Sequence, residues 1–151
     1  MTTNEYHFIT RWKIKGNVDR IYELLSHPLE FPNWWKKIIS ANLLEEIGNR
    51  KPIRLKLKGW LPYTLQWELF NPQFERPYRI TSDSRGDFEG HSAWTLRQVD
   101  QHVEALFDWR VSVRKPFLRK WSFVLRPLFI WNHNYIMKTW KKSLEQKLKE
   151  L

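Results

Sequence analysis

The segment Trp131-Asn132-His133-Asn134-Tyr135-Ile136-Met137 lies inside a long apolar and basic stretch that begins at Lys115 and carries few helix breakers. After Pro116 a helical pattern runs almost to Leu151. Its second half has an apolar stripe at spacings of three and four, formed by Met137, Trp140, Leu144, Leu148 and Leu151. Pro127 is expected to kink the first half or to divide it into two helices, because proline lacks an amide donor and clashes with the preceding turn. The chain therefore ends in a long amphipathic helix.

Ahead of this helix, several segments show the alternation of apolar and polar side chains that is typical of half-buried strands. The alternation is clearest in residues 6–15, where Tyr6, Phe8 and Trp12 share one face. Turn residues 59–62 join two such segments into a hairpin. The expected strands are residues 6–15, 38–44, 53–58, 63–69, 78–80, 93–96 and 103–113.

Two short helices are expected directly after the first strand. Gly16 and Asn17 interrupt the alternation, and apolar residues then follow at helical spacing to about Ser26, with Asn17 as the N-cap. Two X-Pro pairs bracket a second short helical segment that ends at Trp34-Trp35. These two adjacent tryptophans are not both expected to be buried.

The order of these elements predicts the fold. A sheet with one apolar face must bury that face, and only the last helix is long enough to cover it. We therefore predict an α+β fold in which an antiparallel sheet of about seven strands wraps around the C-terminal helix. The 151 residues suit a single domain, residues 1–151. Sheet and helix then enclose a space between them.

Aromatic residues are unusually frequent, with ten Trp, nine Phe and five Tyr. Each such ring can bury about 150–250 Å², so their sum exceeds what an ordinary core requires. Either the core itself is unusually aromatic or some rings line a cavity. Both interpretations stay open at this point, because cores and ligand pockets are lined by the same residue types.

Four segments in a fixed order carry a family resemblance. They are residues 28–35 (Pro-Leu-Glu-Phe-Pro-Asn-Trp-Trp), residues 86–96 (Gly-Asp-Phe-Glu-Gly-His-Ser-Ala-Trp-Thr-Leu), residues 108–111 (Asp-Trp-Arg-Val), and Asn132-His133 followed by Met137. Over nearly its whole length the chain resembles the SRPBCC superfamily, the helix-grip fold shared by START lipid-binding domains and polyketide cyclase/dehydrase-like proteins. The resemblance implies a hydrophobic cavity for a lipid, isoprenoid, polyketide or other small apolar ligand.

The chain departs from this resemblance near its last leucines. Trp140 and Ser143 stand where bacterial relatives usually carry small residues. A Trp on the helix face that looks into the cavity would fill part of it.

The candidate ligand-binding residues are mostly aromatic: Trp35, Tyr63, Trp67, Trp94, Phe107, Trp109, Trp121, His133, Met137 and Trp140. Strand parity places Trp67 and Trp109 on the same side as the core residues, so these two are the surest to face the helix. His133 is the one candidate acid/base or ligand hydrogen-bond donor, since histidine titrates near neutrality. Its alternative role is a helix histidine tied to a backbone group of the sheet.

The sequence lacks the motifs that are typical of several classes of enzyme and metal site. The chain has no cysteine, and the spacing of its five histidines fits no metal site, so neither a metal nor a cofactor is expected. G-x-S-x-G and P-loop sequences are absent, and nothing in the sequence announces an enzyme. The first residues lack a secretory pattern, and residues 121–131 are too short to span a bilayer. A cytoplasmic protein is expected.

The formal net charge of +10 favours anionic partners. Basic residues gather without an intervening acid at Arg110, Arg114, Lys115, Arg119 and Lys120. This segment is either a solvated face or a dock for an anionic membrane. Nucleic acid is disfavoured, because no recognition motif accompanies the charge.

Three functions follow from these observations. The first is non-enzymatic binding or carrying of a small apolar ligand. The second is a cyclase or dehydratase of the same fold, which needs polar groups inside the cavity such as His133, Tyr63 or Arg97. The third is a peripheral module that transfers lipid at a membrane through its basic segment.

Overall fold

The computed structural model describes residues 5–45, 51–59, 63–113 and 122–150. In this part of the chain the elements follow the order β1 (Glu5–Lys15), α1 (Val18–Leu25), the 3-10 helix η1 (Pro28–Glu30), α2 (Phe31–Trp34), β2 (Ile38–Leu43), β3 (Ile53–Lys58), β4 (Thr64–Glu75), β5 (Arg79–Gly86), β6 (Phe88–Val99), β7 (His102–Val113) and α4 (Ser122–Lys149).

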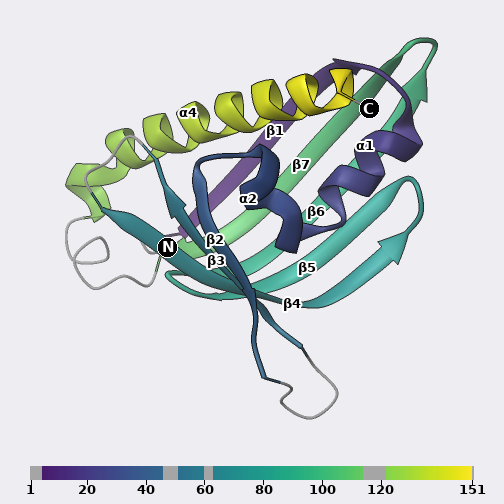
Figure 1. The fold of residues 1–151 in the computed structure, drawn as a ribbon. Helices are drawn as coiled ribbons and strands as arrows, with labels where there is room; N and C mark the ends of the chain where they lie inside the picture. The colour runs from purple at the N-terminus through teal and green to yellow at the C-terminus, as the bar shows by residue number, and fades with distance from the viewer. Residues whose placement is uncertain (1–4, 46–50, 60–62, 114–121, 151) are drawn as a thin grey trace.

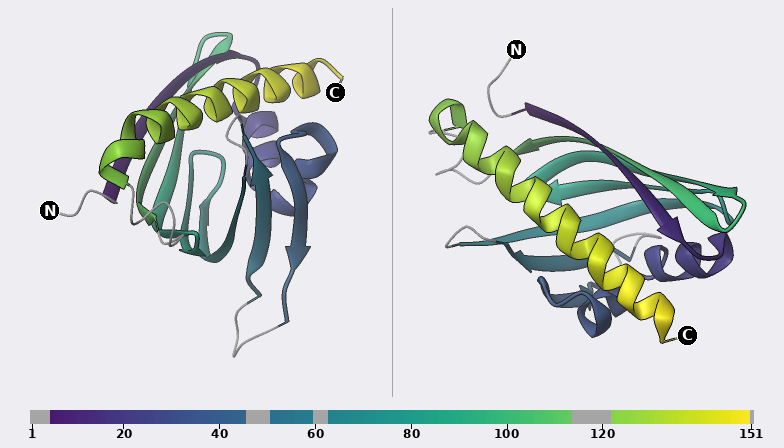
Figure 2. Two further views of the ribbon diagram at one scale, coloured as in Figure 1. Left: turned by 90° about the vertical axis from the view of Figure 1, so that its left-hand side faces the viewer. Right: turned by 90° about the horizontal axis from the view of Figure 1, so that it is seen from above.

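The strands form one antiparallel sheet of seven strands in the order β1-β7-β6-β5-β4-β3-β2. The sheet curves around α4, which crosses the concave face of the sheet. The short helices α1 and α2 lie beside the C-terminal half of α4 (Figures 1 and 2). β1 returns beside β7 over its full length, from Glu5 opposite Ser112 to Lys15 opposite His102. The predicted α+β helix-grip fold, with about seven strands around a long C-terminal helix, is confirmed.

The first connection is fixed by local hydrogen bonds. The Asn17 side chain accepts from the backbone N–H of Asp19 at 2.8 Å, which caps α1 as predicted. The side chain of Gln98 on β6 accepts from the N–H of Val18 at 2.8 Å and so ties the start of α1 to the sheet. At the end of α2, Trp35 is buried and Trp34 is half-buried, in agreement with the expectation that the two are not both buried.

α4 is one helix across Pro127. Of the two predicted effects of Pro127, a kink or a division into two helices, the division is wrong and the kink stays a prediction. Pro127 is the sixth residue of α4, and its ring removes one intrahelical bond near the start of the helix, where few bonds have yet formed. Beyond it, the buried side chains of α4 recur at helical spacing: Phe129, Asn132, His133, Ile136, Met137, Trp140 and Leu144. These residues form the roof over the concave face of the sheet.

β5 and β6 are longer than the alternation predicted. The expected strands covered residues 78–80 and 93–96, whereas the sheet extends over Arg79–Gly86 and Phe88–Val99. Their added residues include Ser82, Ser84 and Ser92, a residue type with no strand preference of its own. Both strands are internal to the sheet and pair on both sides, so tertiary pairing decides their conformation.

Candidate functional site

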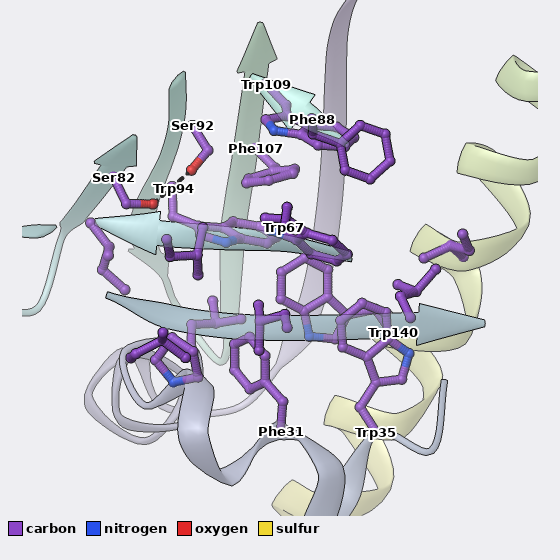
Figure 3. Close-up of a pocket in the computed structure, with 18 of the residues that line it drawn as sticks. Phe31, Trp35, Trp67, Ser82, Phe88, Ser92, Trp94, Phe107, Trp109 and Trp140 are labelled. Carbon is purple, nitrogen blue, oxygen red and sulfur yellow. Dashed lines mark hydrogen bonds between the residues drawn. The ribbon is translucent and has the colours of Figure 1, made fainter. Parts of the chain in front are cut away.

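A cavity of about 200 Å³ lies between the concave face of the sheet and α4. Most of the side chains that line it are apolar and many are aromatic (Figure 3). For scale, an engineered apolar cavity of about 150 Å³ holds one benzene molecule. The aromatic residues around it come from three parts of the fold: Trp67, Phe70, Phe74, Phe88, Trp94, Phe107 and Trp109 from the sheet, Phe129 and Trp140 from α4, and Phe31 and Trp35 from the α2 region.

The wall contributed by β5 and β6 contains small side chains. Ser82 of β5 and Ser92 of β6 both line the cavity, and the two residues lie directly opposite each other in the strand register. Larger rings surround this part of the wall, with Trp94 following Ser92 on the same face. Small residues beside large ones leave the space that the rings enclose.

The end of the cavity nearest α2 is closed by two stacked tryptophans. The rings of Trp35 and Trp140 are 4.5 Å apart and nearly parallel, at 2°. The indole N–H of Trp35 donates to the hydroxyl of Thr139 at 3.2 Å, which holds the pair in place. Trp140 also meets the ring of Trp94 edge to face at 5.1 Å. Trp140 therefore fills this end, as its unusual position in the helix suggested, and leaves the remaining volume open.

His133 lies in the α4 side of the cavity wall with only 6% of its surface exposed. Its ring stacks with Phe8 at 3.8 Å and with Trp109 at 5.5 Å. Burial lowers the pKa of His133 to about 4, so the imidazole is neutral at pH 7. The buried Nε2 has no hydrogen-bond partner among the described residues, so it shows no bond to a backbone group of the sheet.

The structure brings most of the predicted site residues to this cavity. Eight of them line it: Trp35, Trp67, Trp94, Phe107, Trp109, His133, Met137 and Trp140. Trp121 lies outside the described residues. Their binding of a ligand stays a prediction.

Two polar candidates lie elsewhere. Tyr63 precedes β4 and packs, half-buried, against the core without lining the cavity, and burial raises its pKa to about 12. Strand parity alone predicted that Tyr63 faces inward. Parity gives the face of the sheet on which a side chain lies, but not its position along the strand relative to the cavity. Arg97 sits on the opposite, convex face of β6, where it forms an ion pair with Glu104.

Other lining residues were not foreseen from the sequence. The aromatic ones are Phe31, Phe70, Phe74, Phe88 and Phe129, and the polar ones include Ser82 and Ser92. The signal was present in part, because Ile80-x-Ser82-x-Ser84 and Ser92-x-Trp94-x-Leu96 keep the period of two. The alternation was not interpreted as strand, because serine is also a common residue in turns.

The α1–η1 connection and β4 also contribute to the cavity lining. Ser26 and Pro28 come from the connection, and Pro72 and the 54% exposed Phe74 come from β4. Arg76, which follows β4, forms an ion pair with Glu23 of α1 at 2.9 Å. One salt bridge thus links α1 to the end of β4.

Within residues 5–45, 51–59, 63–113 and 122–150, no group of three or more His, Asp or Glu side chains is arranged to hold a metal ion. In the same ranges, no helix has the length and apolar character needed to cross a bilayer.

Comparison of the sequence with models of known families and with curated proteins gave no match. Solved structures are nevertheless similar over nearly the full chain. The protein TTHA0849 from Thermus thermophilus superposes with a TM-score of 0.78 at 16% identity, covering 96% of this chain and 98% of that one.

Two further structures agree. The Zhui aromatase/cyclase from a Streptomyces species gives a TM-score of 0.75 at 10% identity, covering 96% of this chain and 94% of that one. A START superfamily protein from Mycobacterium smegmatis gives 0.69 at 12% identity, covering 95% and 97%. The chain thus has the helix-grip fold of SRPBCC and START-like proteins.

Proposed function

We propose that this protein binds a small apolar ligand in the cavity between the sheet and α4 and carries it without chemical change. The observation that carries the proposal is the aromatic cavity of about 200 Å³. Transfer of apolar surface from water into such a site is worth about 25 cal/mol per Å². Because stacked rings such as Trp35 and Trp140 already hold the walls, little ordering is needed on binding.

The volume narrows the class of ligand. A space somewhat larger than the one that holds benzene, about 150 Å³, suits a molecule of one or two rings or a short isoprenoid. A long diacyl lipid exceeds it. The solved structures of the same fold include one described as an aromatase/cyclase, which supports a ring-shaped ligand as the class to test.

A cyclase or dehydratase is the alternative within this fold. Of the three polar groups that such an enzyme could use, His133 alone lines the cavity. Its Nε2 is covered by neighbouring atoms, and with a pKa of about 4 the ring is neutral at pH 7 and is not in the imidazolium form that acts as a general acid. The geometry therefore favours binding over catalysis.

The test combines native mass spectrometry of the purified protein with equilibrium dialysis against 1-methylnaphthalene. Trp67→Ala and Trp109→Ala should each weaken uptake about three- to tenfold, because a ring contact contributes roughly 0.5–1.5 kcal/mol. Ile39→Ala, on the exposed edge strand β2, is the matched control. Unchanged uptake in both Trp variants, with the fold intact by circular dichroism, would reject this pocket assignment.

A further inference from the structure

We propose that the hydroxyl pair Ser82–Ser92 is a polar subsite of the cavity, and that it selects ligands carrying one neutral hydroxyl or carbonyl group on a small apolar ring system. The proposal rests on the proposed function, namely that the cavity binds a ligand.

The two serines meet across the sheet. Ser82 on β5 and Ser92 on β6 are direct partners in the strand register, and both side chains line the cavity. Their Oγ atoms are 3.0 Å apart and joined by a hydrogen bond, drawn as a dashed line in Figure 3. Both residues are half-buried, so the pair is in the wall and still open to the cavity.

The pair keeps unused hydrogen-bonding capacity. A hydroxyl has one donor and two acceptor lone pairs, and one mutual bond consumes one donor and one acceptor. One O–H donor and several lone pairs therefore remain, and no further bond to either Oγ is seen among the described residues. A ligand hydroxyl or carbonyl oxygen placed there can accept the free O–H.

Serine is an unexpected residue at these two facing positions. It brings no strand preference that would explain its use, and alanine would serve the packing alone. Ser84, two positions after Ser82 on the same face of β5, does not line the cavity, and its buried Oγ is out of reach of a ligand there. The facing pair Ser82–Ser92 therefore points to a polar ligand atom.

The ligand group is neutral because the wall offers no counter-charge. Among the described residues that line the cavity, Lys51 is the charged one, and it is exposed to solvent. A carboxylate or ammonium group beside Ser82 would be buried without an ionic partner, which is strongly unfavourable. Alcohols, phenols and ketones satisfy the serines without this cost.

Other polar lining groups are less suited to the role. The Ser26 hydroxyl already donates to the carbonyl of Glu23 at 3.2 Å. The Nε2 of His133 is covered by protein atoms. Asn132 is buried and is engaged in an interaction of its own. The serine pair is thus the polar group that combines access to the cavity with unused hydrogen-bonding capacity.

The experiment compares two ligands of nearly equal shape, 1-naphthol and 1-methylnaphthalene, by equilibrium dialysis. The measured quantity is the ratio of their dissociation constants in the wild-type protein and in the double variant Ser82→Ala/Ser92→Ala. Loss of about one hydrogen bond should shift this ratio about tenfold against 1-naphthol. Ser112→Ala, on the opposite face of β7, should leave the ratio unchanged.

The outcomes separate the two proposals. If both ligands bind and the ratio does not shift, the polar subsite is rejected while ligand binding stands. If a folded wild-type protein binds neither ligand, the proposed function itself fails. Should the double variant not fold, the single variants Ser82→Ala and Ser92→Ala carry the same comparison, each with an expected shift of about threefold.

Discussion

The concave face of the sheet packs aromatic rings against α4, whereas its convex face carries ion pairs that remain in contact with solvent. On the convex face His7 pairs with Asp108 at 2.8 Å, and His91 with Asp83 at 2.9 Å. On the concave face, neighbouring residues of the same strands, such as Trp109 beside Asp108, line the cavity. Adjacent residues of one strand thus face two different chemical environments, because successive side chains point to opposite faces of the sheet.

This difference supports the proposed ligand binding on the concave side of the sheet. Exposed ion pairs contribute little to stability, with a typical value of about 0–1 kcal/mol, because water competes for both partners. The excess of aromatic residues is gathered on the other face, around a space that is not filled. The large positive charge of the chain and its aromatic content therefore belong to different surfaces, and the aromatic surface is the one at which we propose that a ligand binds.

The comparison is tested most severely at Trp140, which is 7% exposed and touches the rings of Trp35, Trp94 and Phe107. Trp140→Ala should lower the free energy of unfolding by about 3–5 kcal/mol, since a large buried ring is lost and a void remains. Urea denaturation followed by circular dichroism measures this.

The matched control is Trp131→Ala on the outer side of the same helix, where the side chain is 48% exposed. Its effect should be below about 1 kcal/mol, as for most surface substitutions. Equal losses of unfolding free energy in the two variants would show that the side of α4 that faces the sheet is not the structural core of the molecule.

A second test uses pH to distinguish the buried histidine from the exposed ones. Burial lowers the pKa of His133 from 6.5 to about 4, so the unfolded chain takes up this proton first as the pH falls. Stability from this group is complete above about pH 6.5 and declines toward pH 4, at about 1.4 kcal/mol per pH unit and about 3 kcal/mol in all.

Carboxylates titrate in the same range, so the informative quantity is the difference between the wild type and His133→Leu. The pH profile of the variant should be flatter between pH 6.5 and 4, measured by urea denaturation at each pH. Parallel profiles would mean that His133 is accessible to protons in the folded state, contrary to its place among Phe8 and Trp109.

The fold was predictable because its signals are local. The alternation in β1 and β7 and the apolar stripe of α4 each follow from residues close in sequence, and only one arrangement of a long helix and a half-apolar sheet buries both. Parity along a strand also placed Trp67 and Trp109 correctly on the concave face.

The cavity was less predictable because it depends on register between strands. Ser82 faces Ser92 only because β5 and β6 pair with a short turn at Asp87, whose side chain accepts from the N–H of Gln66 at 2.9 Å. Nothing in the local sequence of either serine specifies that pairing. The position of Tyr63 outside the cavity lining has the same origin, since its face was known but its position relative to α4 was not.

The last test concerns the convex face at Arg110 and the basic residues that follow Arg110 in the sequence. Arg110 extends from β7 into solvent, with 69% of its side chain exposed, and lies 3.7 Å from Asp108. Arg114, Lys115, Arg119 and Lys120 lie outside the described residues, and docking of this segment on an anionic membrane stays a prediction. We expect binding to vesicles that contain phosphatidylserine at low salt, with each basic residue near the surface contributing about 1 kcal/mol.

Two triple variants make the comparison specific. Substitution of Lys115, Arg119 and Lys120 by Ser should abolish vesicle binding, whereas substitution of Arg11, Lys13 and Lys56, which removes the same charge from β1 and β3, should leave most of it. High salt should suppress binding by the wild type, because exposed charges that lie farther apart than about 10 Å are already largely screened at 0.1 M, and this distance shortens as the salt concentration rises. Equal losses in both variants would mean that the net charge alone attracts the membrane. Cosedimentation distinguishes these results. Neither outcome bears on the proposal that the aromatic cavity binds a ligand, because the cavity lining carries none of these charges.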